Sequence, residues 1–223
     1  MGNYSGFLDV LHWSPKEYAQ LAQDLVAIGQ QYDACVNAAA EALNQMGASG
    51  VWTGYLYNSL VNRFNEKRQV LDDDAYELTT VIPAAISKQA EAQASASNAP
   101  VTPVSLAEHA TILTASETAD DGSGAVFIDP TAVEALMNAF IENLNKANEN
   151  ATNYHELFES TISKGWNVSD DIKQMESKIS EIADRVHEFN ESFKVEMEEC
   201  AKDSINTMAA AQEASASQAQ NLS

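Results

Sequence analysis

Basic residues, glycine, proline and cysteine are all scarce in this chain. Its 223 residues include 12 Lys and Arg against 33 Asp and Glu, a net charge of -21. Such a surface repels phosphate backbones and anionic lipid headgroups, which argues against nucleic acid and membrane surfaces as partners. With 9 Gly, 5 Pro and abundant Ala, the composition favours a mostly helical chain.

The two cysteines do not form a disulfide framework. Cys35 and Cys200 each fall on an apolar helical face, so we expect buried thiols rather than a disulfide. No apolar run approaches the roughly 18 residues needed to span a bilayer. Residues 1–13 contain neither a basic residue nor an apolar segment of signal-peptide length. Any export is therefore expected to proceed without a cleaved leader.

A first long helix is predicted to begin at Ser14-Pro15, where Ser14 would cap it and Glu17 would lie in its first turn. Apolar residues then recur at steps of three and four, which is the pattern of one buried helical stripe. They are Tyr18, Leu21, Leu25, Ile28, Tyr32, Cys35, Ala39, Leu43 and Met46. Gly47 and Gly50 are expected to end this helix.

The stretch Trp52-Thr53-Gly54 is predicted to form a bend between this helix and a second one that ends near Ser97. Pro83 is expected to kink the second helix because it removes a backbone hydrogen bond. The run Asp72-Asp73-Asp74 is interpreted as a solvated face, since consecutive helical residues point in different directions and do not converge on a cation.

A linker of about 30 residues is predicted over 99–128, where the composition shifts to Ala, Ser, Asn and Pro. Within it, a short helix is possible from Leu106 to Ala115, and Ala125 to Ile128 reads as a short apolar clip. The predicted organisation is thus a first hairpin over 1–98, this linker, and a second hairpin over 129–223.

The second hairpin repeats the landmarks of the first. Asp129-Pro130 resembles the start at Ser14-Pro15, and Gly165-Trp166 lies almost as far beyond it as Trp52 lies beyond Pro15. Ser169 is expected to cap a last helix of near-heptad spacing, which should fray beyond Ala209. Because neither hairpin can cover its own apolar stripe, we predict an all-α fold in which both pack as an antiparallel four-helix bundle, an intramolecular pseudo-dimer.

Residues typical of catalysis or metal binding are not arranged for either. His12, His109, His155 and His187 have no ligand spacing and are interpreted as solvated or edge residues. The sequence contains no nucleophile-elbow motif and no Gly-rich phosphate loop. We therefore predict no enzymatic activity, no metal, no cofactor and no small-molecule substrate.

Trp52-Thr53-Gly54 between two amphipathic helices, followed by Leu56, Leu60 and Phe64 on one face, is similar to the WXG motif. The chain thus resembles the WXG (ESAT-like) family, helical hairpins exported by type VII secretion systems. Two such units would be fused here, the second with Trp166-Asn167-Val168 in place of the motif. The aromatic-x-x-x-acid secretion signal of the family follows neither hairpin.

The resemblance implies a non-enzymatic interaction protein, a substrate or component of a type VII secretion system. Its partners would be a secretion ATPase or a co-secreted helical protein, and it would be a monomer, cytoplasmic before export and then secreted. Trp52, Gly54 and Trp166 would contact the secretion machinery, while Gly50 and Gly165 would form the bends. From the residues themselves, packing of the hairpin ends is favoured over recognition as the role of both Trp rings. The alternative function is a cytoplasmic chaperone or adaptor that binds a helical partner, such as a secreted toxin.

Overall fold

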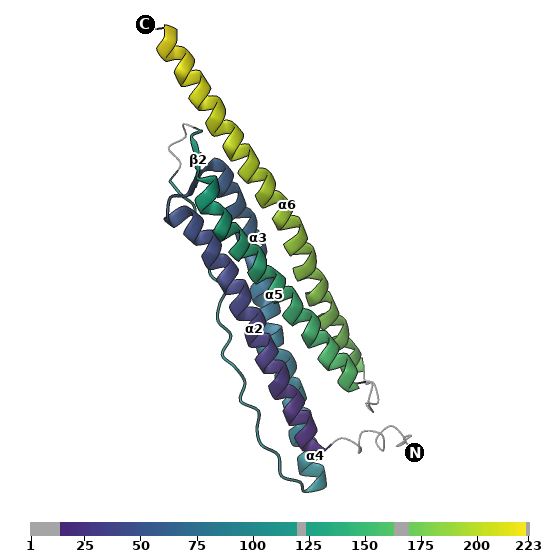
Figure 1. Cartoon of the computed structure of the whole chain (residues 1–223). Helices are drawn as coiled ribbons and strands as arrows, with labels where there is room; N and C mark the ends of the chain where they lie inside the picture. The colour runs from purple at the N-terminus through teal and green to yellow at the C-terminus, as the bar shows by residue number, and fades with distance from the viewer. Residues whose placement is uncertain (1–13, 120–123, 163–169, 222–223) are drawn as a thin grey trace. The chain divides into compact units, whose positions relative to one another are not determined.

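A computed structural model describes residues 14–119, 124–162 and 170–221, and these residues are predominantly helical (Figure 1). The prediction of an all-α chain is confirmed apart from two strands of three residues each. The elements in chain order are α2 (Pro15–Ala48), β1 (Trp52–Gly54), α3 (Tyr55–Tyr76), the π-helix η1 (Glu77–Val81), α4 (Ile82–Ser97), β2 (Val126–Ile128), α5 (Pro130–Ile162) and α6 (Asp170–Asn221).

The chain divides into two compact units, each of which contains segments of both predicted hairpins. Unit 1 comprises Met1–Cys35, Val70–Thr111 and Lys146–His187; unit 2 comprises Val36–Gln69, Ile112–Asn145 and Glu188–Ser223. The units therefore group the residues differently from the hairpin boundaries that the sequence suggests.

The predicted helix starts at Ser14-Pro15 and Asp129-Pro130 are found, and the predicted cap Ser169 lies outside the described residues. Ser14 and Glu17 form a capping box, in which the Ser14 amide donates to Glu17 Oε2 at 2.7 Å and the Glu17 amide donates to Ser14 Oγ at 3.4 Å. At α5, the carboxylate of Asp129 accepts from the amides of Thr131 and Ala132 at 3.1 and 3.0 Å. At both starts a capping side chain thus accepts hydrogen bonds from amides that have no partner within the helix.

The core of unit 2 is aromatic. The ring of Phe64 on α3 lies 6.1 Å from Phe140 of α5 and 6.3 Å from Phe193 of α6, both in edge-on geometry. Phe189 lies 6.2 Å from the same ring. Edge-to-face pairs add about 0.5–1.5 kcal/mol each to the stabilisation from apolar burial. The cluster therefore holds α3, α5 and α6 together within this unit.

The core of unit 1 includes charge. Asp74 is only 3% exposed, and the Arg185 guanidinium donates to it through Nε at 3.2 Å. Burial raises the pKa of the Asp74 carboxyl, although Arg185 acts in the opposite direction; the same hydrogen bond raises the pKa of Arg185. Asp72 contacts His109 at 3.0 Å, while Asp73 is exposed. The interpretation of this acidic run as a solvated face is therefore wrong for Asp72 and Asp74.

The disruption expected at Pro83 takes the form of the π-helix η1, in which the Ile82 amide donates to the Glu77 carbonyl. The next bond of this register would join residue 83 to the Leu78 carbonyl, but proline has no amide hydrogen. The Tyr154 hydroxyl donates to Leu78 O instead, at 3.1 Å. A side chain of α5 thus satisfies the carbonyl that the proline leaves open.

Three further predictions are corrected. Residues 106–115 form no helix, and α6 remains helical to Asn221, although its residues 210–220 are exposed. Cys35 and Cys200 are free thiols, but both are half-buried rather than buried.

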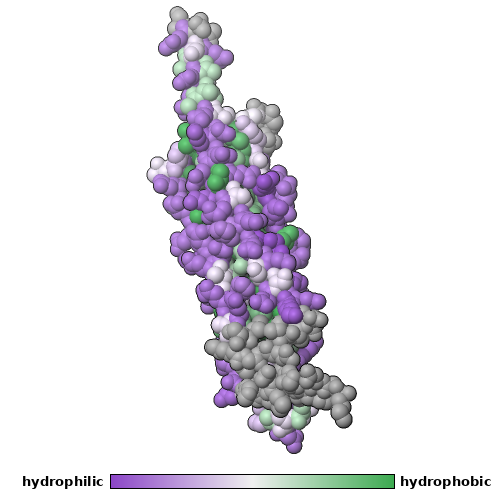
Figure 2. Space-filling view, turned by 90° about the vertical axis from the view of Figure 1, so that its right-hand side faces the viewer, coloured by the Kyte–Doolittle hydropathy of each residue, from purple (hydrophilic) through white to green (hydrophobic). Residues whose placement is uncertain are grey.

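Within the described part of the chain, no helix combines the length and apolar character needed to cross a membrane. The face drawn in Figure 2 is mainly hydrophilic, with separate hydrophobic residues on it.

Candidate functional site

The Trp-Thr-Gly motif, called the joint below (Trp52–Gly54), connects α2 to α3 as a strand rather than as a plain bend. It pairs antiparallel with β2, in the register Trp52↔Ile128, Thr53↔Phe127 and Gly54↔Val126. The sequence predicted the apolar clip but not its partner, because a strand of three residues carries too short an alternation to be recognised. The linker therefore returns to the motif and closes it.

The side chain of Trp52 lies inside unit 2. The residue is 0% exposed, its Nε1 donates to Ser204 Oγ at 2.9 Å, and its ring centroid lies 6.1 Å from that of Tyr57. Ser204 in turn donates to the Cys200 carbonyl at 2.8 Å. A buried indole needs such an acceptor, and a serine on α6 provides it. Trp52 thus has the packing role in this structure, and its recognition by secretion machinery stays a prediction.

Gly54 is the residue of the joint that no other amino acid fits. Its φ is +97°, and an added Cβ would lie 2.3 Å from the Ala125 carbonyl oxygen. Both the left-handed backbone and the close approach of β2 therefore require glycine. Gly50 also has a positive φ of +70°, but it is exposed and open space surrounds it. Gly165 and Trp166, the predicted counterparts in the second hairpin, lie outside the described residues.

A second group of contacts involves residues 112–118 of the linker, called the strap below. In unit 2 the strap follows α2 and α3 without secondary structure of its own. Side-chain amides hold it by its main chain: Asn65 donates to the Ala115 carbonyl at 2.8 Å and accepts from the Ala115 amide at 2.9 Å. Asn58 makes the same pair of bonds with the main chain of Thr118, at 3.0 and 2.9 Å.

Residues of α2 complete this set of contacts. Asn44 accepts from the Ser116 amide at 2.7 Å and donates to the Thr114 carbonyl at 3.1 Å. Asn37 accepts from the Leu113 amide at 2.9 Å. An Asn side chain carries one carbonyl and one NH₂ group, so it can pair with a peptide group as a neighbouring β-strand would. Asn residues thus replace a partner strand for the strap.

Two longer side chains also donate to strap carbonyls. Arg68 Nη1 donates to Ile112 O at 3.0 Å. The Tyr57 hydroxyl lies 2.9 Å from Leu43 O and 3.3 Å from Ser116 O. Burial raises the pKa of Tyr57 to about 12, so the phenol keeps its proton to a higher pH than an exposed tyrosine does. Tyr57 therefore links the strap to the joint, since its ring also contacts Trp52.

The strap presents every third residue to the helices. Ile112 and Ala115 are 1% and 3% exposed, and Thr118 is half-buried, whereas the residues between them are exposed. A period of three is typical of the polyproline II conformation, which has no internal hydrogen bonds and leaves its main chain free to bind side chains. The sequence does not show this period, because Leu113 is apolar but exposed and Thr118 is polar but half-buried; the prediction of a short helix from Leu106 to Ala115 is wrong.

His109 is paired with acidic residues in unit 1, where a solvated or edge position was predicted. Its Nε2 lies 3.0 Å from Asp72 and its Nδ1 3.5 Å from Asp33, and its side chain is 13% exposed. The Asp33 carboxylate also accepts from the Ala110 amide at 2.9 Å. These residues form no metal site, and the described part of the chain holds no cluster of metal-ligating side chains.

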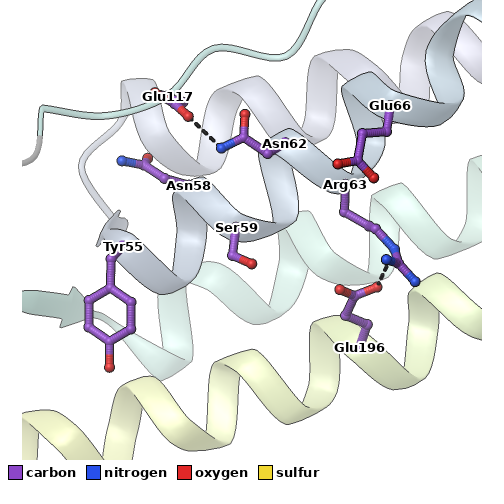
Figure 3. Close-up of a pocket in the computed structure, with 8 residues that line it drawn as sticks. All are labelled: Tyr55, Asn58, Ser59, Asn62, Arg63, Glu66, Glu117 and Glu196. Carbon is purple, nitrogen blue, oxygen red and sulfur yellow. Dashed lines mark hydrogen bonds and ion pairs between the residues drawn. The ribbon is translucent and has the colours of Figure 1, made fainter.

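A hollow on unit 2 lies beside the strap (Figure 3). Its volume is about 510 Å³, and its lining is polar: Tyr55, Asn58, Ser59, Asn62, Arg63, Glu66, Glu117 and Glu196. Arg63 is ion-paired with Glu196 at 3.3 Å, and Asn62 donates to Glu117 at 2.6 Å. Ser59 has no histidine among these lining residues.

No protein-family model matches this chain, and neither a curated protein nor a solved structure shows significant similarity to it.

Proposed function

We propose that this chain is a non-enzymatic helical interaction protein, a substrate or component of a type VII (ESAT-like) secretion system. The observation that carries the proposal is the joint. A Trp-x-Gly triplet connects two long amphipathic helices, and its glycine has a backbone conformation and a neighbour that exclude a Cβ. The motif thus has a structural reason for its residue types, as expected for a hairpin of the WXG kind.

The second part of the proposal is that α5 and α6 form a second hairpin, packed on the first as an antiparallel four-helix bundle. Contacts inside unit 2 support this arrangement. Trp52 in the joint pairs with Ser204 of α6, and Arg63, further along the chain on α3, pairs with Glu196, which comes earlier on α6. The two segments therefore run in opposite directions. In unit 1, Asp74 and Glu77 pair with Arg185 and Lys178 in the same opposed order.

A fused pair of hairpins would be a monomer, because each hairpin covers the apolar stripe of the other. Sedimentation equilibrium should accordingly give a mass near the 24.1 kDa of one chain. A stable dimer at micromolar concentration would contradict the pseudo-dimer.

Export is the decisive test of the function. In cells that carry a type VII system, mass spectrometry of the culture supernatant should detect the chain, and inactivation of the secretion ATPase should remove it. A cytoplasmic lysis marker must be absent from the same supernatant. Retention in the cytoplasm with the ATPase intact would refute export, and a stoichiometric helical partner recovered there would support the chaperone alternative.

The Trp52→Phe variant separates the two roles of the indole. Phenylalanine keeps an aromatic ring in the site but loses the hydrogen bond to Ser204. Loss of export at an unchanged melting temperature would indicate recognition of the joint by the secretion machinery. A lower melting temperature with a matching loss of export would indicate packing alone.

A further inference from the structure

We propose that α2 and α3 form a groove in unit 2 that binds an extended peptide through its main chain, and that the strap is its intramolecular ligand. The partner that fits is an extended protein segment with an apolar side chain and, three residues later, a small one. This proposal does not depend on export of the chain.

The groove recognises main chain far more than side chains. Asn58 and Asn65 each bind both the amide and the carbonyl of one strap residue, at 2.8 to 3.0 Å. Such paired bonds require an extended peptide in one register but place no demand on the identity of the residue that supplies them. A receptor for extended segments of varied sequence needs this type of contact.

Two positions of the strap provide the selectivity. Ile112 and Ala115 are buried between the helices, whereas Leu113 is 44% exposed. The groove therefore takes one branched apolar residue and one small residue, separated by two residues that face solvent. The strap residues 112–116 carry no charge, which avoids repulsion in a chain of net charge -21.

Spacing on the helices shows how the groove is built. Asn37 and Asn44 lie two turns apart on α2, and Asn58 and Asn65 lie two turns apart on α3. Residues two turns apart project from the same face of a helix. Each helix thus contributes a row of amides, and the strap lies in contact with both rows.

A tethered strap competes strongly with any free peptide, because a linked ligand has an effective concentration of about millimolar. The groove should therefore be occupied by the strap at rest and accept a partner segment once the strap leaves. The Ile112→Asp variant of the full chain is designed to release the strap, since burial of an unpaired carboxylate in the groove is unfavourable.

Fluorescence anisotropy would measure binding of a labelled synthetic peptide of residues 110–119 with the natural sequence. The Ile112→Asp chain should bind this peptide at least about tenfold more tightly than the natural chain. Adding Asn65→Ala to the released chain should weaken binding about tenfold, because both bonds to Ala115 are lost. A matched Asn62→Ala change should weaken it less than about threefold, since the hydrogen bond of Asn62 to the Glu117 side chain is exposed.

Two altered peptides test main-chain recognition directly. Methylation of the peptide nitrogen of Ala115 should abolish binding, while Lys in place of Leu113 should not weaken it. Failure of the natural peptide to bind a released chain of unchanged helicity, measured by circular dichroism, would overturn the proposal.

Should Ile112→Asp lose helicity, a chain with residues 110–118 replaced by Gly and Ser takes its place in the same assay. It contains no buried charge and leaves the sequences of α2 and α3 unchanged. If this chain also loses its helices, the strap belongs to the folding core and is not a separable ligand, which equally overturns the proposal.

Discussion

The joint and the strap both contact the start of α3, but they do so by opposite chemistry. The joint buries a large side chain and brings two backbones together at a glycine. The strap buries only Ile112 and Ala115, and polar side chains bind its main chain. The most conspicuous motif of the sequence thus packs the interior of unit 2. Hydrogen bonds to a peptide main chain are made by Asn residues of α2 and α3 that carry no motif of their own.

Truncation at the joint should have the largest effect. Trp52→Ala removes a fully buried ring and leaves Ser204 without its donor, so it should lower the free energy of unfolding by about 3–5 kcal/mol. Denaturation by urea would measure this. Phe127→Ala on the adjacent β2, where the ring is 48% exposed, is the control and should change stability by about 0.5 kcal/mol or less. Equal effects of the two variants would contradict the packing role.

The two glycines near the joint give a matched pair. Gly54→Ala places a Cβ against the Ala125 carbonyl at a positive φ, and should cost at least about 2 kcal/mol of stability. Gly50→Ala has the positive φ without the neighbour and should cost about 1 kcal/mol. The difference between the melting temperatures of the two variants would measure the cost of the contact between the added Cβ and the Ala125 carbonyl. A Gly54→Ala chain as stable as Gly50→Ala would show that β2 can move away from the joint.

At the strap, a single substitution should have a smaller effect. Asn65→Ala removes both bonds to the main chain of Ala115, each worth about 0.5–1.5 kcal/mol net, and should cost about 1–2 kcal/mol. The matched Asn62→Ala variant should cost less than about 0.5 kcal/mol, because its contact with Glu117 is exposed. Urea denaturation compares the two, and a larger loss for Asn62→Ala would contradict main-chain binding by Asn65.

Tyr57 contacts both regions, and its removal should have the smallest effect at neutral pH. Tyr57→Phe loses bonds to Leu43 O and Ser116 O and should cost about 1 kcal/mol. Burial raises the pKa of this phenol from 10.0 to about 12. The folded chain therefore holds the proton more tightly than the unfolded chain, and the resulting stability is complete below pH 10 and lost as pH rises to about 12. The difference in free energy of unfolding between the natural chain and Tyr57→Phe should accordingly be smaller at pH 11 than at pH 8. A difference that stays constant between these pH values would contradict a raised pKa in the folded chain.

The long helices were predictable because their signals are local and repeated. Ser14-Pro15 and Asp129-Pro130 both start helices as expected, and the apolar stripe from Tyr18 to Met46 lies in α2. The burial of Asp74 was not predictable, because its partner Arg185 is remote in sequence. Pairing of that kind depends on the packing of whole helices rather than on any local pattern.

The candidate sites were predicted in part. The sequence located the joint and the need for glycine in it, but not the strand that closes it. The strap was interpreted as part of a linker with a short helix from Leu106 to Ala115. The Asn residues spaced by seven on α2 and α3 were the available signal. Their meaning depends on which helix faces receive the linker, and that is a property of the packed chain.

Hydrogen exchange of the natural chain at neutral pH tests the contrast between joint and strap most directly. The amide of Asp129 donates to Val51 O at 2.8 Å and reports on the joint, while the Ala115 and Ser116 amides report on the strap. A separable ligand opens without unfolding of the helices, so the strap amides should exchange at least about a hundredfold faster than Asp129 and the amides around Phe64. Equal rates for the strap, the joint and α3 would contradict the account.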